Sequence, residues 1–255
     1  MSRALPSAPP ANGAAVGAPP PDPALGIFET LLFAEGRIHA AEEHLSRLRR
    51  SAIELYGLRA PASLPRRLAA LERRLAGAER PGAACAQERR VRIDARPSGG
   101  RLLTEITLAA PHRVERRPRA LAPVTLAGGL GAHKWRDRRL LDLLGADPVP
   151  LLVDEHGWVL EAAWANVWLL AGAQLSTPPA DGRILPGVTR ALLLERAPAL
   201  GLRACERPIS VQELGPGATV LLTSAVRLAV CAAVGRAPAR EPDQVKLIRA
   251  ALRRP

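Results

Sequence analysis

The feature that most constrains the fold of this chain is a pair of adjacent strand patterns in its first half. Residues 89–96 carry an apolar side chain at every second position, namely Val91, Ile93 and Ala95. This alternation indicates a strand with one buried and one polar face. Residues 97–100 read Pro-Ser-Gly-Gly, a turn, and a second strand is predicted over 102–108. The chain must therefore cover the apolar face of an antiparallel hairpin.

Two predicted helices can supply that cover. Residues 41–56 place apolar side chains on one face and end at Gly57, and residues 63–76 begin with the capping residue Ser63. Arg47 falls on a different side of the first helix from Leu45 and Leu48, so the residues alone favour a solvated arginine there.

A strand over 26–33 and the start of a returning strand at 38–39 precede these helices. We therefore expect a small α+β domain over residues 25–120. Residues 1–24 are almost entirely Ala, Pro, Gly and Ser, a composition that predicts a disordered tail.

The rest of the chain predicts a larger domain over residues 121–255. Residues 116–123 form a connector rich in Pro and Arg, and a helix is expected over 135–144. Strands are predicted at 150–154, 158–161, 166–170, 202–207, 219–223 and 229–234, a long turn at 176–183, and helices ending near 200, at 210–214 and over 242–252.

Composition argues against several functional classes. The formal net charge is +12, but the arginines are scattered and aromatic residues make up only 3% of the chain, which disfavours nucleic-acid binding. The three cysteines and five histidines lack the spacing of metal sites or disulfide frameworks. Neither a transmembrane run nor a signal peptide is apparent, so a cytoplasmic protein is expected.

Lysine is unusually rare in the chain. Of 36 lysines and arginines, only Lys134 and Lys246 are lysines. Arginine cannot lose its proton at working pH, whereas a buried lysine can do so and can form a Schiff base. Lys134 is therefore a candidate catalytic residue. The alternative is a surface lysine that survived an arginine-favouring composition.

Several motifs, in order, resemble the class IV aminotransferases, the fold-type IV group of pyridoxal phosphate enzymes. They are Gly26-Ile-Phe-Glu-Thr30, Gly36-Arg37, Glu43-His-Leu-Ser-Arg-Leu48, Ser51-Ala52, His133-Lys134, Asp154 through Gly157 to Glu161, Asn166-Val167, Thr177-Pro-Pro, Leu185-Pro-Gly-Val-Thr-Arg190 and Thr223-Ser-Ala-Val-Arg227. The resemblance covers residues 25 to 235. It implies a two-domain α+β and α/β fold like that of D-amino acid aminotransferase, and pyridoxal 5'-phosphate as cofactor.

The resemblance also implies roles for individual residues. Lys134 corresponds to the Schiff-base lysine, and Glu161 to the acid beside the pyridine nitrogen of the cofactor. Four residues correspond to the phosphate site, namely Arg47, Val188, Thr189 and Thr223. Asn166 corresponds to a residue that bonds a loop near the cofactor, and Ser224 and Ala225 would lie near the substrate carboxylate. Without the resemblance, Glu161, Thr189 and Thr223 could equally be ordinary residues at strand or helix ends.

The reaction is less constrained. The spacing from Lys134 to the Asp137-Arg138 pair resembles the 4-amino-4-deoxychorismate lyases, which release 4-aminobenzoate and pyruvate for folate synthesis. Branched-chain aminotransferases usually have a tyrosine where this chain has Arg139. The resemblance thus implies a lyase acting on a small anionic substrate after a chorismate-amidating synthase, as a homodimer. Arg96, Arg138 and Arg227 are candidates for binding its carboxylates.

Two alternatives stay open. One is a class IV transaminase of the branched-chain or D-amino acid type, which would share every cofactor residue. The other is a basic binding module that kept the fold and lost the chemistry.

Overall fold

The computed structural model describes residues 14–15, 20–78, 88–109 and 114–253. The predicted tail lies mostly outside this part. Its described residues include strand β1 (Ala14–Ala15), which pairs with a strand of the larger sheet, and a 3-10 helix, η1 (Pro23–Leu25). Residues 20–24 therefore belong to the folded part of the chain, so the predicted tail extends too far.

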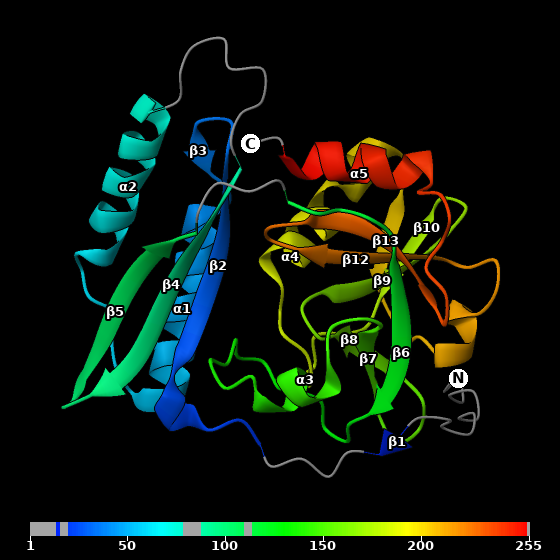
Figure 1. The fold of residues 1–255 in the computed structure, drawn as a ribbon, viewed down its shortest axis with the longest axis horizontal. Coiled ribbons are helices and arrows are strands. Elements are labelled where there is room, and N and C mark those ends of the chain that lie inside the picture. Colours follow the sequence, from blue (N-terminus) through cyan, green and yellow to red (C-terminus); the bar gives the residue numbers. More distant parts are fainter. Residues whose placement is uncertain (1–13, 16–19, 79–87, 110–113, 254–255) are drawn as a thin grey trace, which may run out of the picture.

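A four-stranded antiparallel sheet forms the first structural unit, in the order β3-β2-β4-β5. The strands are β2 (Ile27–Ala34), β3 (Arg37–Ile38), β4 (Arg89–Ser98) and β5 (Arg101–Leu108). Helices α1 (Ala41–Tyr56) and α2 (Leu64–Ala78) cover one face of this sheet (Figure 1). The predicted hairpin and its two covering helices are thereby confirmed.

Strand β2 is buried on both faces. Ile27, Leu31 and Phe33 point into the core beneath α1 and α2. Leu32 and Ala34, at the alternate positions, join a core formed by the larger sheet and its helices. Because side chains alternate between faces along a strand, β2 joins the two halves of the molecule.

The second unit is a nine-stranded sheet, in the order β11-β10-β9-β12-β13-β6-β7-β8, with β1 added beside β6. Its other strands are β6 (Arg119–Thr125), β7 (Val149–Val153), β8 (Val159–Ala162), β9 (Asn166–Ala171), β10 (Gln174–Thr177), β11 (Arg203–Glu206), β12 (Thr219–Ser224) and β13 (Leu228–Val234).

Helices α4 (Val188–Arg196) and α5 (Asp243–Arg253) pack on one face of this sheet, around the buried ring of Trp168. The opposite face buries side chains of β6 to β9 and β12 against η3 (Val211–Leu214). A further 3-10 helix, η2 (Ala197–Leu200), extends α4. No helix in the described part of the chain has both the length and the apolar character needed to cross a membrane.

Three local predictions were wrong. The expected connector at 116–123 contains most of β6, which pairs with β13 and β7 in the middle of the sheet. The helix expected over 135–144 is only α3 (Arg139–Leu144), because Trp135 forms an isolated antiparallel bridge with Ile27. The expected turn at 176–183 overlaps the end of β10.

Candidate active site

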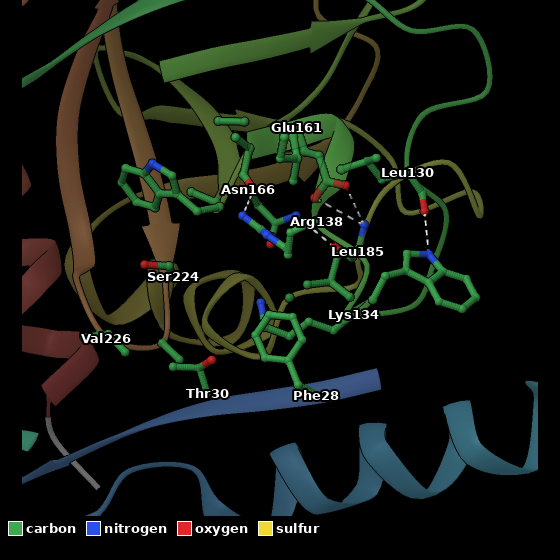
Figure 2. Close-up of a pocket in the computed structure, with 18 of the residues that line it drawn as sticks. Phe28, Thr30, Leu130, Lys134, Arg138, Glu161, Asn166, Leu185, Ser224 and Val226 are labelled. Atoms are coloured by element: carbon green, nitrogen blue, oxygen red, sulfur yellow. Dashed lines mark hydrogen bonds between the residues drawn. The ribbon is translucent and has the colours of Figure 1, made fainter. Parts of the chain in front are cut away.

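A cavity of about 870 Å³ opens between the two sheets. Its walls come from one face of β2, the loop around Lys134, the ends of β8 and β12, and the start of α4. Figure 2 shows Phe28 and Thr30 of β2 on one side, and Glu161 and Asn166 on the other, with Lys134 between them. Nearly all of the sequence-predicted site residues line this cavity: Arg47, Lys134, Arg138, Glu161, Asn166, Val188, Thr189, Thr223, Ser224, Ala225 and Arg227.

The backbone of β2 fixes the position of Lys134. The amide of Phe28 donates to the Lys134 carbonyl at 2.8 Å, and the amide of Arg136 donates to the Gly26 carbonyl at 3.0 Å. The Lys134 Nζ atom lies 4.9 Å from the centroid of the Phe28 ring. Burial, reinforced by the nearby Arg47 charge, lowers the pKa of Lys134 to about 8. About a tenth of this amine is therefore uncharged at pH 7, far more than for an exposed lysine.

Glu161, at the end of β8, is a buried carboxyl group. Burial raises the pKa of Glu161 to about 7, although the Leu185 amide and the charges of Lys134, Arg47 and Arg138 act in the opposite direction. The Leu185 amide donates to both carboxyl oxygens, at 3.3 and 3.4 Å. Glu161 can therefore hold or release a proton near neutrality.

Asn166 fixes the loop that precedes α4. Its Nδ2 donates to the Leu185 carbonyl at 2.9 Å, so both backbone groups of Leu185 are held by site residues. The Asn166 Oδ1 atom approaches Gly187 so closely that a Cβ built there would lie 1.9 Å away. This hydrogen bond to the loop agrees with the role that the resemblance implies for Asn166, and the close approach favours glycine at 187.

The start of α4 is suited to bind an anion. The N-cap residue Gly187 has no side chain that could accept a hydrogen bond from the first turn of the helix. The first N–H groups of α4, including those of Val188 and Thr189, therefore face the cavity uncapped. Arg47 donates to the Pro186 carbonyl at 3.1 Å, which brings its guanidinium to this helix end. The Thr223 hydroxyl accepts from Trp168 Nε1 at 2.9 Å and keeps its own hydrogen for a ligand.

Arg47 is held by a buried carboxylate. Its Nε and Nη2 donate to Glu29 of β2 at 2.8 and 2.6 Å, and His44 Nδ1 lies 2.7 Å from the same carboxylate. Arg47 is only 5% exposed, so the solvated position favoured by helix periodicity is wrong. Sequence reasoning assigned no role to Glu29 or His44. The signal was a charged residue inside an apolar strand, which requires a partner when buried.

The predicted substrate residues differ in their placement. Arg138 lines the cavity and donates to the Ala163 carbonyl at 3.2 Å. The Ser224 Oγ atom is buried and has no hydrogen-bond partner among the described residues. Arg96 is exposed and does not line the cavity, although it lies on the same face of β4 as the cavity-lining Arg92, so the structure gives its proposed role no support.

These groups fit pyridoxal 5'-phosphate. Arg47, the Thr223 hydroxyl and the uncapped start of α4 can hold a phosphate. Glu161 can hold the ring nitrogen, and Lys134 offers an amine inside the cavity, next to the Phe28 ring.

Comparisons with known proteins agree with this geometry. Residues 132–233 match the model of the family described as amino-transferase class IV. A segment of 64 residues is 39% identical to a probable branched-chain-amino-acid aminotransferase of Synechocystis. That segment is 25% of this chain and 21% of the relative, so the match spans about a fifth of the curated protein.

Solved structures match over much more of the chain. A hypothetical aminotransferase from Mycobacterium tuberculosis in its PLP-bound form is 25% identical, with a TM-score of 0.74 over 89% of this chain and 88% of that one. A putative 4-amino-4-deoxychorismate lyase from Legionella pneumophila is 18% identical, with a TM-score of 0.71 over 94% and 99%. The expected fold is thereby confirmed. Residues 132–233 therefore carry a match to the class IV aminotransferases, a family of pyridoxal 5'-phosphate enzymes, and 89% of the chain has the fold of a solved aminotransferase.

Proposed function

We propose that this protein is a pyridoxal 5'-phosphate-dependent 4-amino-4-deoxychorismate lyase that releases 4-aminobenzoate and pyruvate. The observation that carries the proposal is the excess of positive charge in the cavity wall. Six arginines line the cavity, namely Arg47, Arg90, Arg92, Arg138, Arg139 and Arg227. A substrate with two carboxylates suits such a wall, whereas a branched aliphatic side chain does not.

The acids in the same wall leave much of this charge uncompensated. Asp137 is paired with Arg139 at 2.6 Å, and Glu115 with Arg117 at 2.7 Å. Glu161 has a pKa near 7 and is only partly ionised at neutral pH. Three lining arginines have no carboxylate within salt-bridge distance in the described part of the chain; these are Arg90, Arg138 and Arg227.

The position of the only tyrosine also favours a lyase. Tyr56 donates its hydroxyl to the Pro23 carbonyl at 2.9 Å and does not line the cavity. The branched-chain aminotransferases that the sequence resembles usually have a tyrosine where Arg139 stands here, and no other tyrosine is present to replace it.

Each residue then has a defined part in the reaction. The bound cofactor supplies an electron sink for the carbon that bears the substrate amine. Lys134 Nζ, with a pKa of about 8, takes the proton from that carbon, and the adjacent ring C–O bond then breaks with its electron pair leaving on the enolpyruvate oxygen. The protonated Lys134 can return the proton to the methylene carbon of the enolpyruvate, which gives pyruvate. Glu161 keeps a proton available at the ring nitrogen, and Arg47 and Thr223 anchor the phosphate. The β2 side chains Phe28 and Thr30 close the cavity on the opposite face.

A transaminase is the second candidate. The name of the Synechocystis relative and the description of the Mycobacterium tuberculosis structure both favour it. Such an enzyme would use the same lysine, acid and phosphate site. The arginine-rich wall then favours an acidic oxo acid as amino acceptor.

The test is to load the protein with pyridoxal 5'-phosphate and add 4-amino-4-deoxychorismate, following 4-aminobenzoate by its fluorescence. We expect product from the natural protein and from Lys246→Ala, whose ammonium is exposed and paired with Asp243. Lys134→Ala should form product about 10²- to 10⁴-fold more slowly. A folded, cofactor-loaded protein that forms no product, but consumes an amino donor with an oxo acid, would overturn the lyase in favour of the transaminase.

A further inference from the structure

The turn between β12 and β13 presents an arginine to the cavity in an unusual setting. Arg227 lines the cavity, and its Cζ atom lies 4.4 Å from the centroid of the Trp164 ring. Trp164 belongs to the short turn between β8 and β9 and lines the same cavity. Stacking on an indole holds the guanidinium plane and leaves its edge available for hydrogen bonds.

The guanidinium lacks the partners that its neighbours have. Arg116 is bonded to Glu88 at 2.8 and 3.0 Å, and Arg119 to Glu115 at 2.9 Å. Arg227 has no such carboxylate, and its buried Nε has no hydrogen-bond partner among the described residues. A buried donor without an acceptor is costly, and an anion in the cavity would relieve that cost.

The charges around Arg227 favour an anion. Burial and the neighbouring Arg119, Arg90 and Arg116 all lower the pKa of Arg227, and Glu115 acts in the opposite direction. Glu115 is already shared between Arg117 and Arg119, at 2.7 and 2.9 Å. The field at this end of the cavity is therefore positive.

The turn itself is held in place. Arg116 donates to the carbonyls of Arg227 at 3.2 Å and Val226 at 3.4 Å. Leu228, the next residue, has a φ of +60°, a left-handed conformation that leucine rarely adopts. In Figure 2 the end of β12, marked by Ser224 and Val226, lies across the cavity from Leu130 and Lys134. Arg227 is thus fixed at a position separate from the reacting amine.

We propose that Arg227, stacked on Trp164, is a specificity-determining residue that binds the second carboxylate of a dianionic substrate. The identity of that substrate rests on the proposed function, but carboxylate binding at this position does not. In 4-amino-4-deoxychorismate, one carboxylate is on the ring and the other on the enolpyruvyl ether at the adjoining meta position. Arg227 binds the carboxylate on the enolpyruvyl ether and thereby separates dicarboxylates from monocarboxylates that carry only the ring carboxylate.

The test uses two inert ligands that differ by one carboxylate, 3-(carboxymethoxy)benzoate and 3-methoxybenzoate. Their affinities for the cofactor-loaded protein are measured by titration calorimetry. We expect the natural protein to prefer the dicarboxylate, and Arg227→Gln to reduce that preference by about tenfold or more while changing monocarboxylate binding little. The matched control Arg236→Gln removes the same charge at an exposed site after β13 and should keep the preference.

Either of two results would overturn the proposal. One is an unchanged dicarboxylate preference in Arg227→Gln, and the other is an equal loss for both ligands. If Arg227→Gln does not fold, Arg227→Lys replaces it; this variant keeps the charge but loses the planar fork, and the preference should still fall. A dicarboxylate preference that depends on Arg227, in a protein that makes no 4-aminobenzoate, would refute the lyase and retain the subsite.

Discussion

The buried carboxylate of Glu29 allows the most direct test of how the cofactor site is held. Glu29 is 1% exposed and accepts two hydrogen bonds from Arg47, with His44 at 2.7 Å. Glu29→Gln keeps the shape of the side chain and removes its charge. The amide can present only one oxygen, so its NH₂ group faces either Arg47 or His44 and leaves the Arg47 charge without its counter-ion.

The size of the effect follows from the ionisation of Glu29. Burial alone would raise the pKa of this carboxyl, but Arg47 and His44 outweigh burial and lower it from 4.5 to about 2. That difference corresponds to about 3 kcal/mol of stabilisation at neutral pH. Removing one partner of a buried ion pair costs about 3 to 5 kcal/mol, which agrees. For a chain of this length, such a loss lowers Tm by about 6 to 12 °C.

The sign of the pH dependence provides a second check. Because the pKa of Glu29 is lower in the folded protein, its stabilisation is complete above about pH 4.5 and disappears as the pH falls toward 2. The Glu29→Gln variant cannot titrate at this position. The difference in stability between the natural protein and the variant should therefore narrow over that interval.

The assay is thermal unfolding of the cofactor-free protein, followed by circular dichroism at pH 7 and at intervals down to the lowest pH at which unfolding stays reversible. Glu42→Gln is the matched control. Glu42 lies in the first turn of α1, the helix that carries Arg47, and pairs with Arg49, but its side chain is 70% exposed. That change should cost no more than about 1 kcal/mol. If Glu29→Gln lowers Tm no more than Glu42→Gln does, the argument for a stabilising buried ion pair is wrong.

Three further predictions follow from the site. Lys134→Ala should abolish the yellow colour of the loaded protein and lower turnover about 10²- to 10⁴-fold. In the natural protein, borohydride reduction of the loaded form followed by peptide mapping should label Lys134 and leave Lys246 unmodified. The rate of cofactor incorporation into the cofactor-free protein, followed by absorbance, should rise with pH up to about 8 and then level off, because only the neutral amine of Lys134 reacts. A rate that keeps rising steeply beyond pH 9 would contradict the lowered pKa. Gly187→Ala should destabilise the protein by about 1 to 3 kcal/mol in denaturant unfolding and weaken cofactor binding, because the new Cβ meets Asn166. The control is Gly77→Ala, in an open position of α2, which should raise the free energy of unfolding by up to about 1 kcal/mol.

The sequence was most informative where local patterns determine structure. The alternation at Val91, Ile93 and Ala95 predicted β4 correctly, and helix periodicity ending at Gly57 predicted α1 to the residue. These signals are local, since one arises from the two faces of a strand and the other from helix amphipathicity and a left-handed glycine at the helix end.

Prediction failed where distant segments determine local structure. Pro123 lies inside β6, a central strand, although proline usually disfavours such positions. The composition of that segment therefore indicated a connector. Residues around Trp135 have an acceptable helical sequence, but the bridge to Ile27 holds them extended. No pattern within either segment reports the partner strand that decides the outcome.

The placement of the site residues was predictable only through the resemblance, and β2 shows why. Its alternate side chains serve different purposes: Glu29 faces α1 and holds Arg47, while Phe28 and Thr30 face the cavity. The backbone of the same strand holds Lys134 through the Phe28 amide. A slip of one residue in register would exchange these two faces. It would move the carboxylate into the cavity, beside the amine, and leave Arg47 unpaired in the core. The pairing of β2 with β4, from Ile27–Ala95 to Phe33–Arg89, therefore determines the chemistry of the cavity as well as the fold.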